Sequence, residues 1–297
     1  MKKNDIAQNN TKLCKCLVSV ASRNKTIQPD AGPFEIEVKR DIAYLNGQVV
    51  SMEDLWRGSV ISGYDKAVMD AIYSIWSDRK DKASEACSMK YTEIYNRMNG
   101  GKVTRTSPET YERIQLAIRK LRKLNLVLYI ANDFERVAKY FGMEDLAKHK
   151  PTEARIEGYL LDARQVTFKL ATGKTTMGIR VLSCPILYQY AEAQKQIITV
   201  PSEWIDIPGK TTEKKISVRD YLISYIRGEE YRERNFQKKL SYKAIFEGAG
   251  IEWDKDRKNQ YKDRLLVNSI LDYYITIDAI KGYAVAEDTA TLMIKVK

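Results

Sequence analysis

The chain has 297 residues and a net charge of +11, from 50 lysines and arginines against 39 aspartates and glutamates. Its single histidine, His149, excludes Ser–His and Cys–His catalysis, paired-histidine metal hydrolysis and the histidine-pair nickases of rolling-circle replication. No apolar run approaches the ~18 residues of a membrane span, and Met1 to Gln8 lacks a signal-peptide core, so we expect a cytoplasmic protein of about two domains without a membrane partner.

The sequence has no phosphate-binding loop or zinc motif with the required residue spacing. Two turns, at residues 173–176 and 209–212, resemble the end of a phosphate-binding loop, but Phe168 and Trp204 stand where its first glycine is required. Cys14 and Cys16 are too close together for a usual zinc pair and have no second pair, so we expect free thiols. The sequence predicts no cofactor, no metal and no enzymatic activity. A nuclease that uses carboxylates alone stays open, although no spacing favours one.

The N-terminal third begins with a polar segment. Residues 1–33 show little apolar periodicity and are predicted to be mostly disordered. Residues 34–39 alternate as a strand, and Asn46-Gly47 is typical of a two-residue hairpin turn; we expect this stretch to pack on the first domain. Ser62 then begins a helix with the apolar stripe Val68, Ile72, Ile75 and Trp76.

A longer helix follows a short strand and a short helix. The pattern predicts a strand at 87–90 and a helix at 93–98, capped by Thr92 and ended by Gly100-Gly101. Ser107 as N-cap and Pro108 at the first helical position start a basic helix that runs to about residue 125, and 126–130 follow as a strand. This order, completed by a hairpin, indicates a winged helix-turn-helix.

The middle of the chain is rich in strand patterns. A small helix is predicted at 134–141 and strands at 155–161, 166–170 and 177–182, which either extend the wing or bridge the domains. A helix at 186–194 and a strand at 196–200 come next. From residue 212 the first pattern returns, with a helix, a short helix at 242–247, a long helix from about 256 to 274, and a hairpin at 275–286 and 289–296.

The two halves repeat with an offset of 150 residues. Positions that keep this offset include the pairs Val68/Val218, Ile72/Leu222, Gly100/Gly250 and Leu121/Leu271. The match fails where Ile114 faces Arg264 and Ile118 faces Asn268. A period this long indicates two copies of a domain. We predict an α+β fold of two winged-helix domains in tandem, at residues 34–182 with extra strands and 183–297, related by internal duplication and separated by a β-rich segment.

Both long helices are candidate DNA readers, since each stretch, 107–125 and 255–264, carries five basic and two acidic residues. The N-terminal part of such a helix enters the major groove, where Arg and Lys bind guanine or phosphate and Asn and Gln match adenine. The second helix has its candidates at its start: Lys255, Arg257, Lys258, Asn259, Gln260, Lys262 and Arg264. The first begins with acidic residues, and its candidates come later, at Arg113, Arg119, Lys120 and Lys123.

We therefore expect double-stranded DNA as the partner and the second domain as the main reader of sequence. The first helix is better suited to phosphate contacts or to a partner surface. The alternative is that these are solvated helix faces with ion pairs such as Glu109 with Arg113, four residues apart.

Three stretches, 63–73 (GYDKAVMDAIY), 184–191 (CPILYQYA) and 218–226 (VRDYLISYI), resemble plasmid replication initiators of the iteron-binding, theta-type class. The likeness covers roughly residues 60–297. It implies that the two domains bind direct repeats at an origin, that homodimers repress their own gene, and that monomers open the duplex and recruit host replication proteins. It also implies that nuclease and ATPase sites are missing.

Three functions compete at this point. The first is replication initiation for a plasmid or related mobile element. The second is transcriptional regulation by a stable dimer on a palindrome. The third is a mobile-element protein whose basic helices bind and inhibit a host protein.

Overall fold

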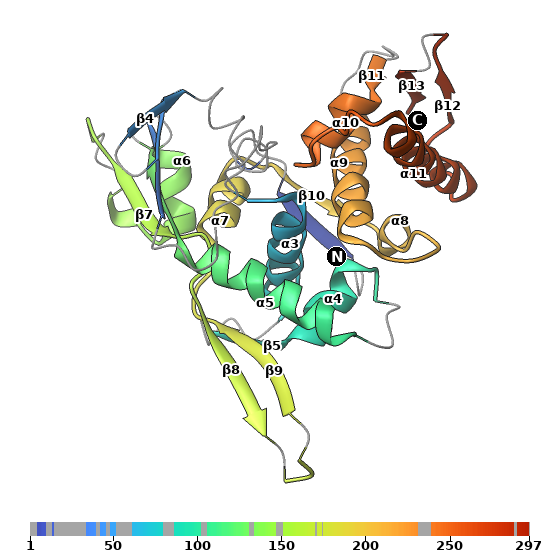
Figure 1. Cartoon of the computed structure of the whole chain (residues 1–297). Coiled ribbons are helices and arrows are strands. Elements are labelled where there is room, and N and C mark those ends of the chain that lie inside the picture. The colour runs from blue at the N-terminus through green and yellow to red at the C-terminus, as the bar shows by residue number, and fades with distance from the viewer. Residues whose placement is uncertain are drawn as a thin grey trace.

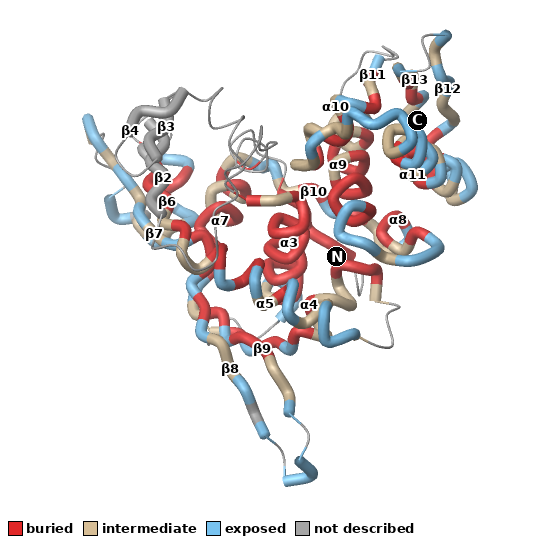
Figure 2. Tube along the Cα trace, viewed as in Figure 1, coloured by how far each residue is buried: buried red, intermediate tan, exposed pale blue. Residues whose placement is uncertain are grey.

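The computed structural model describes residues 5–9, 14, 34–39, 42–45, 48–51, 61–79, 86–101, 106–130, 134–146, 151–169, 171–173, 175–230, 239–287 and 290–296. Over these residues the fold mixes helices and sheets, as the predicted α+β class requires (Figure 1). Buried residues form two clusters, one that contains helix α3 (Gly63–Asp78) and one that contains most of the buried residues of helix α9 (Glu213–Glu230) (Figure 2). We call them the first and the second unit.

The first unit contains a helix, a strand, two helices and a later hairpin. After α3 come β5 (Cys87–Lys90), α4 (Tyr91–Met98) and α5 (Pro108–Lys123), and the hairpin is β8 (Ala163–Lys169) with β9 (Thr175–Val181). The strands pair in the order β5-β9-β8, all antiparallel. In Figure 1 the β8–β9 hairpin projects away from the helices.

The second unit has the same order of elements. It runs through α9, β11 (Lys239–Ser241), α10 (Tyr242–Gly248), α11 (Arg257–Thr276), β12 (Gly282–Val285) and β13 (Thr291–Lys295). Its strands pair in the order β11-β13-β12, so in both units the first strand pairs with the last.

The helix starts follow the predicted capping signals. Ser62 and Asp65 form a reciprocal capping box at α3, and Ser107 caps α5 with Pro108 at its start. The exception is α4, which begins at Tyr91 and not at the predicted residue 93, because β5 leads directly into it. Gly100 and Gly250 follow the short helices with φ of 69° and 76°, a left-handed conformation that favours glycine.

The strand that follows α5 belongs to a five-stranded sheet. Its order is β4 (Gln48–Ser51), β3 (Ile42–Leu45), β2 (Phe34–Lys39), β6 (Leu124–Tyr129) and β7 (Arg155–Tyr159), with β2 parallel to β6. The N-terminal strands therefore pair with the first unit, as expected. In contrast, β7 joins this sheet and does not extend the β8–β9 hairpin. One short helix, α6 (Phe134–Ala138), and two 3-10 turns, η2 (Lys139–Phe141) and η3 (Glu144–Leu146), separate β6 from β7.

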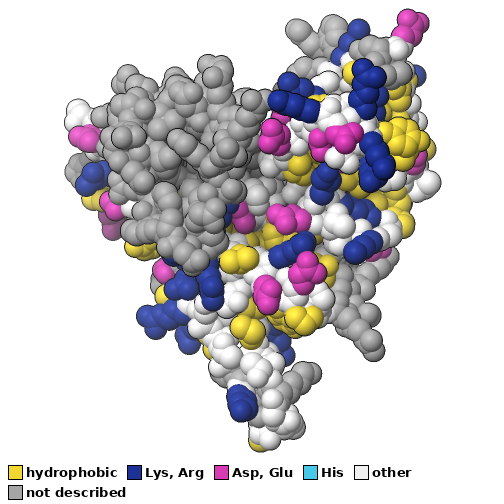
Figure 3. All heavy atoms as spheres, in the orientation of Figure 1, with side chains coloured by type: hydrophobic (Ala, Val, Ile, Leu, Met, Phe, Trp, Pro, Cys, Tyr) yellow, Lys and Arg dark blue, Asp and Glu magenta, His cyan; other side chains and the backbone are white. Residues whose placement is uncertain are grey.

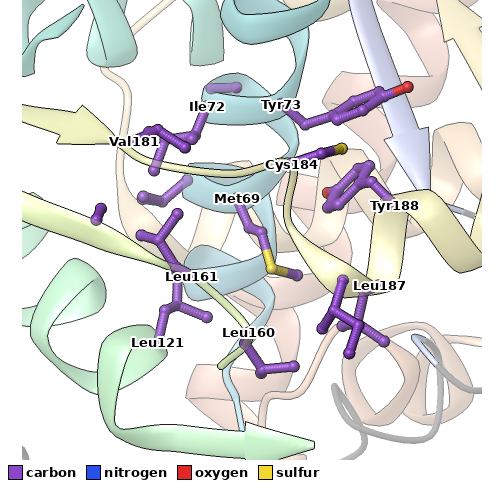
Figure 4. Packing of buried hydrophobic residues seen from close by; sticks show 14 of the residues in the cluster. Met69, Ile72, Tyr73, Leu121, Leu160, Leu161, Val181, Cys184, Leu187 and Tyr188 are labelled. Atoms are coloured by element: carbon purple, nitrogen blue, oxygen red, sulfur yellow. The ribbon is translucent and has the colours of Figure 1, made fainter. Parts of the chain in front are cut away.

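The first core also includes α7 (Ile186–Ala193). Leu187 and Tyr188 of α7 belong to the same buried cluster as Met69 and Tyr73 of α3 and Leu121 of α5, and the Tyr188 ring stacks on that of Tyr73 (Figure 4). The first core thus continues to Ala193, while β10 (Ile197–Val200) and α8 (Ser202–Ile205) contribute Val200, Trp204 and Ile205 to the second; the domain boundary between residues 182 and 183 stays a prediction.

Strand β1 (Ile6–Asn9) corrects the prediction for the N-terminus. All four residues are buried, and the strand pairs antiparallel with β10. The expectation of a mostly disordered segment over residues 1–33 is wrong for these four residues. Apart from Asp5 and Cys14, the rest of that range lies outside the described residues.

Candidate nucleic-acid interface

Helix α11 has a buried side and an exposed side along its first three turns. Asp256 caps it by accepting a hydrogen bond from the backbone N–H of Lys258 at 2.8 Å. Asp263 and Val267 face the core. The 3.6-residue period places Arg257, Lys258, Tyr261, Lys262 and Leu265 on the opposite side, where the structure finds all five exposed. We call these five residues the outer face of α11.

Two predicted readers lie off this face. Asn259 Nδ2 donates to Asp254 Oδ2 at 2.8 Å, and Gln260 Nε2 donates to the Asp254 carbonyl oxygen at 2.8 Å. Hydrogen bonds from the Asp256 backbone and from Asn259 also lower the pKa of Asp254. The two amides hold the turn before α11, so the adenine pairing expected of them requires that this turn opens.

Two further predicted residues differ in exposure. Lys255 is exposed just before the helix. Arg264 is half-buried, and its guanidinium lies 5.6 Å from the centre of the Tyr242 ring, close enough for a cation–π contact with the start of α10. The exposed charge of the predicted reader therefore comes from Lys255, Arg257, Lys258 and Lys262. In Figure 3, Lys and Arg side chains lie beside hydrophobic ones over the region that α11 occupies in Figure 1.

The predicted residues of α5 divide into surface and core. Arg113 is exposed and forms the expected ion pair with Glu109 at 2.9 Å; Arg119 is exposed and Lys123 half-buried. Lys120 is only 6% exposed, and its Nζ lies 2.6 Å from Asp65 Oδ2 of α3. The prediction that Lys120 lies on a DNA surface is wrong, because a buried ammonium paired with a carboxylate cannot reach a phosphate.

Apolar residues on the outer sides of both long helices were not predicted. Tyr261 and Leu265 are 64% and 50% exposed, and Leu116 of α5 is 44% exposed. Leu116 and Leu265 each lie nine residues after the N-cap of their helix, Ser107 or Asp256. Their position off the buried stripe is the signal in the sequence that could have indicated them.

The β8–β9 hairpin adds a second basic surface that sequence reasoning missed. Arg164 and Arg180 are cross-strand partners, and both are exposed. Neither forms an ion pair with any other described residue. Like charges placed directly opposite each other destabilise a sheet, and an anion bound between them would relieve the repulsion. The strand alternation was visible in the sequence, but the pairing register was not.

A cleft of about 720 Å³ lies between the units. It is lined by the start of α5, with Arg113, and by the start of α9, with Lys210 and Lys214 nearby. Glu109 and Glu213 also line it, so the charge there is mixed and selects an anion less clearly than the outer face of α11 does.

The described part of the chain shows neither a candidate metal site nor a candidate membrane-spanning helix. Its residues include no group of three or more His, Cys, Asp or Glu side chains that could hold a metal ion. Cys87 and Cys184 are free, buried thiols, and Cys14 is buried; Cys16 and His149 lie outside the described residues. No described helix has both the length and the apolar character needed to span a membrane.

Comparison of the chain with protein-family models, with curated proteins and with solved structures gives no match.

Proposed function

We propose that this chain binds double-stranded DNA sequence-specifically through two winged helices in tandem, and that it initiates replication of a plasmid or related mobile element by binding repeated origin sites. The observation that carries the proposal is the repeated order of helix, strand, two helices and hairpin, with the same strand order in both units. In a winged helix the third helix of this order is the one that enters the major groove.

Charge supports the second unit as the reader. The outer face of α11 has three cations, Arg257, Lys258 and Lys262, on its first two turns. At the same positions counted from the N-cap, α5 has Pro108, Glu109 and Arg113, and Arg113 is paired with Glu109. Phosphates attract the first arrangement more strongly than the second.

The test is selection of bound fragments from a random duplex pool, repeated at two salt concentrations. Enrichment of one defined site that occurs as direct repeats is the expected result. A palindrome would favour the dimeric regulator. Binding that higher salt abolishes, without sequence preference, would overturn the proposal and favour the third function, binding to a host protein.

A second experiment addresses the helix itself. Replacing Arg257 and Lys258 with Ala should weaken binding to the selected site by about 1–3 kcal/mol for each base whose hydrogen bonds to these side chains are lost. Where the two side chains bind phosphate, the weakening is uniform across sequences and the salt dependence becomes shallower. Unchanged affinity would contradict the placement of α11 in the groove.

A further inference from the structure

The centre of the outer face of α11 is apolar. Tyr261 and Leu265 are one helical turn apart and are 64% and 50% exposed. Lys258 and Lys262 flank them along the same side of the helix. Packing among the described residues leaves both exposed, because the buried stripe of α11 lies on the other side, at Val267 and its neighbours.

The surrounding cations restrict what this apolar centre can contact. A groove lined with phosphates attracts Lys258 and Lys262 and brings Tyr261 and Leu265, on the same side of the helix, against the base edges. In the major groove the only apolar group at a base edge is the C5-methyl of thymine. The amides of Asn259 and Gln260, which would read adenine, are bound to Asp254 instead.

We propose that Tyr261 and Leu265 read thymine by packing on its methyl group, so that the preferred site has one or two thymines opposite the second and third turns of α11. This inference rests on the proposed function, since it names the base that the same helix recognises.

The test uses the duplex selected by the full chain. Each thymine is replaced in turn by deoxyuridine, which keeps the base pair and lacks only the methyl, and the dissociation constant is measured for each duplex. We expect weakening of about fourfold per methyl at one or two positions, which is the effect of one buried methyl group on a binding constant.

Variants assign the effect to residues. In Leu265→Ala and Tyr261→Ala the uridine effect should shrink or disappear at those positions. Leu146→Ala is the matched control, because Leu146 is 53% exposed, as Leu265 nearly is, but lies in η3, outside both long helices. It should retain the full uridine effect. Since all three side chains are exposed, the variants should unfold at the same urea concentration as the natural chain.

The outcomes separate the two proposals. Specific duplex binding that is insensitive to uridine at every position, or equally sensitive in all variants, overturns the thymine inference and leaves the proposed function standing. Failure to bind any duplex at either salt concentration overturns both, in favour of a protein partner for this face.

Discussion

The ammonium group of Lys120 and the carboxylate of Asp65 form a buried pair, with side chains only 7% and 9% exposed. Asp65 also accepts a hydrogen bond from the Ser62 backbone N–H, so it is tied to the start of α3. We expect Lys120→Ala to lower the free energy of unfolding by about 3 kcal/mol, because it leaves a buried carboxylate without its counter-charge. Urea unfolding at pH 7 measures this.

Lys123 provides the control for Lys120 on the same helix. It is half-buried, and we expect Lys123→Ala to change the unfolding free energy by less than about 1 kcal/mol. Equal losses of stability for both variants would contradict the burial of Lys120. In DNA-binding measurements Lys120→Ala should leave the salt dependence unchanged.

The buried cysteines offer a second test at the residue scale. Burial raises the pKa of the Cys87 and Cys184 thiols, and only the thiolate is a nucleophile. We expect iodoacetamide at pH 8 to leave both unmodified in the folded protein and to alkylate both in urea, as read by peptide mass spectrometry. Alkylation of either thiol at the same rate with and without urea would contradict this prediction.

At the scale of elements, local signals predicted the helices well because caps and apolar stripes depend on neighbours in sequence. The prediction of one fixed offset of 150 residues between the two units was less accurate. The N-caps Ser107 and Asp256 are 149 residues apart, and Tyr91 and Tyr242, the first residues of α4 and α10, are 151 apart. With the offset of 149, Ile118 pairs with Val267, and both are fully buried, which removes one mismatch.

Pairing between distant strands could not be predicted in this way. Leu126, Val127 and Leu128 of β6 are buried on both faces of the strand, which explains their continuous apolar run. The run does not reveal that one neighbour is β2, about 90 residues earlier. For the same reason the burial of Lys120 and the partners of Asn259 and Gln260 depend on tertiary contacts that helix periodicity alone does not give.

Strand β1 was missed because it is short and half of its residues, Gln8 and Asn9, are polar. Three of its residues have buried hydrogen-bond partners. The Ala7 backbone N–H donates to Ser74 Oγ of α3 at 2.8 Å, and Ser224 Oγ of α9 donates to Gln8 Oε1 at 3.1 Å. Asn9 Nδ2 donates to the Leu187 carbonyl oxygen at 2.8 Å. One strand of four residues is thus bound by helices of both units.

We predict that deletion of residues 1–9 lowers the stability of both units. Each buried polar partner left unsatisfied costs about 1–3 kcal/mol, so the urea midpoint should fall and amide exchange should rise in both α3 and α9. Ser74→Ala, which removes one partner only, should have a smaller effect. Faster exchange confined to α3 would contradict a shared role for β1.

At the scale of the molecule, the junction uses equivalent residues from both units. Helices α3 and α9 pack together, and Ser74 and Ser224, both bonded to β1, differ by 150 in number. Asp70 and Asp220 have the same relation. Asp70 binds Lys66 and Tyr188, and Asp220 binds Arg219 at 2.8 Å. Because each of these two buried carboxylates is paired with a cation, the junction can hold the units in one arrangement without an uncompensated charge at either position.

The two units approach each other closely at Gly63, the first residue of α3. A Cβ at this position would lie 2.4 Å from the Ala249 carbonyl oxygen and 2.8 Å from Ser217 Cβ, distances that force the backbones apart. We therefore expect Gly63→Ala to destabilise the chain by about 1–3 kcal/mol through overpacking. Gly228→Ala in α9 is the matched control, since among the described residues no other part of the structure lies within 4 Å of the position that its Cβ would take. There the change should stabilise by about 0.5–1 kcal/mol, the usual gain of alanine over glycine in a helix. Urea unfolding of both variants gives the comparison, and a Gly63→Ala chain at least as stable as the natural one would show that α3 does not approach the second unit this closely.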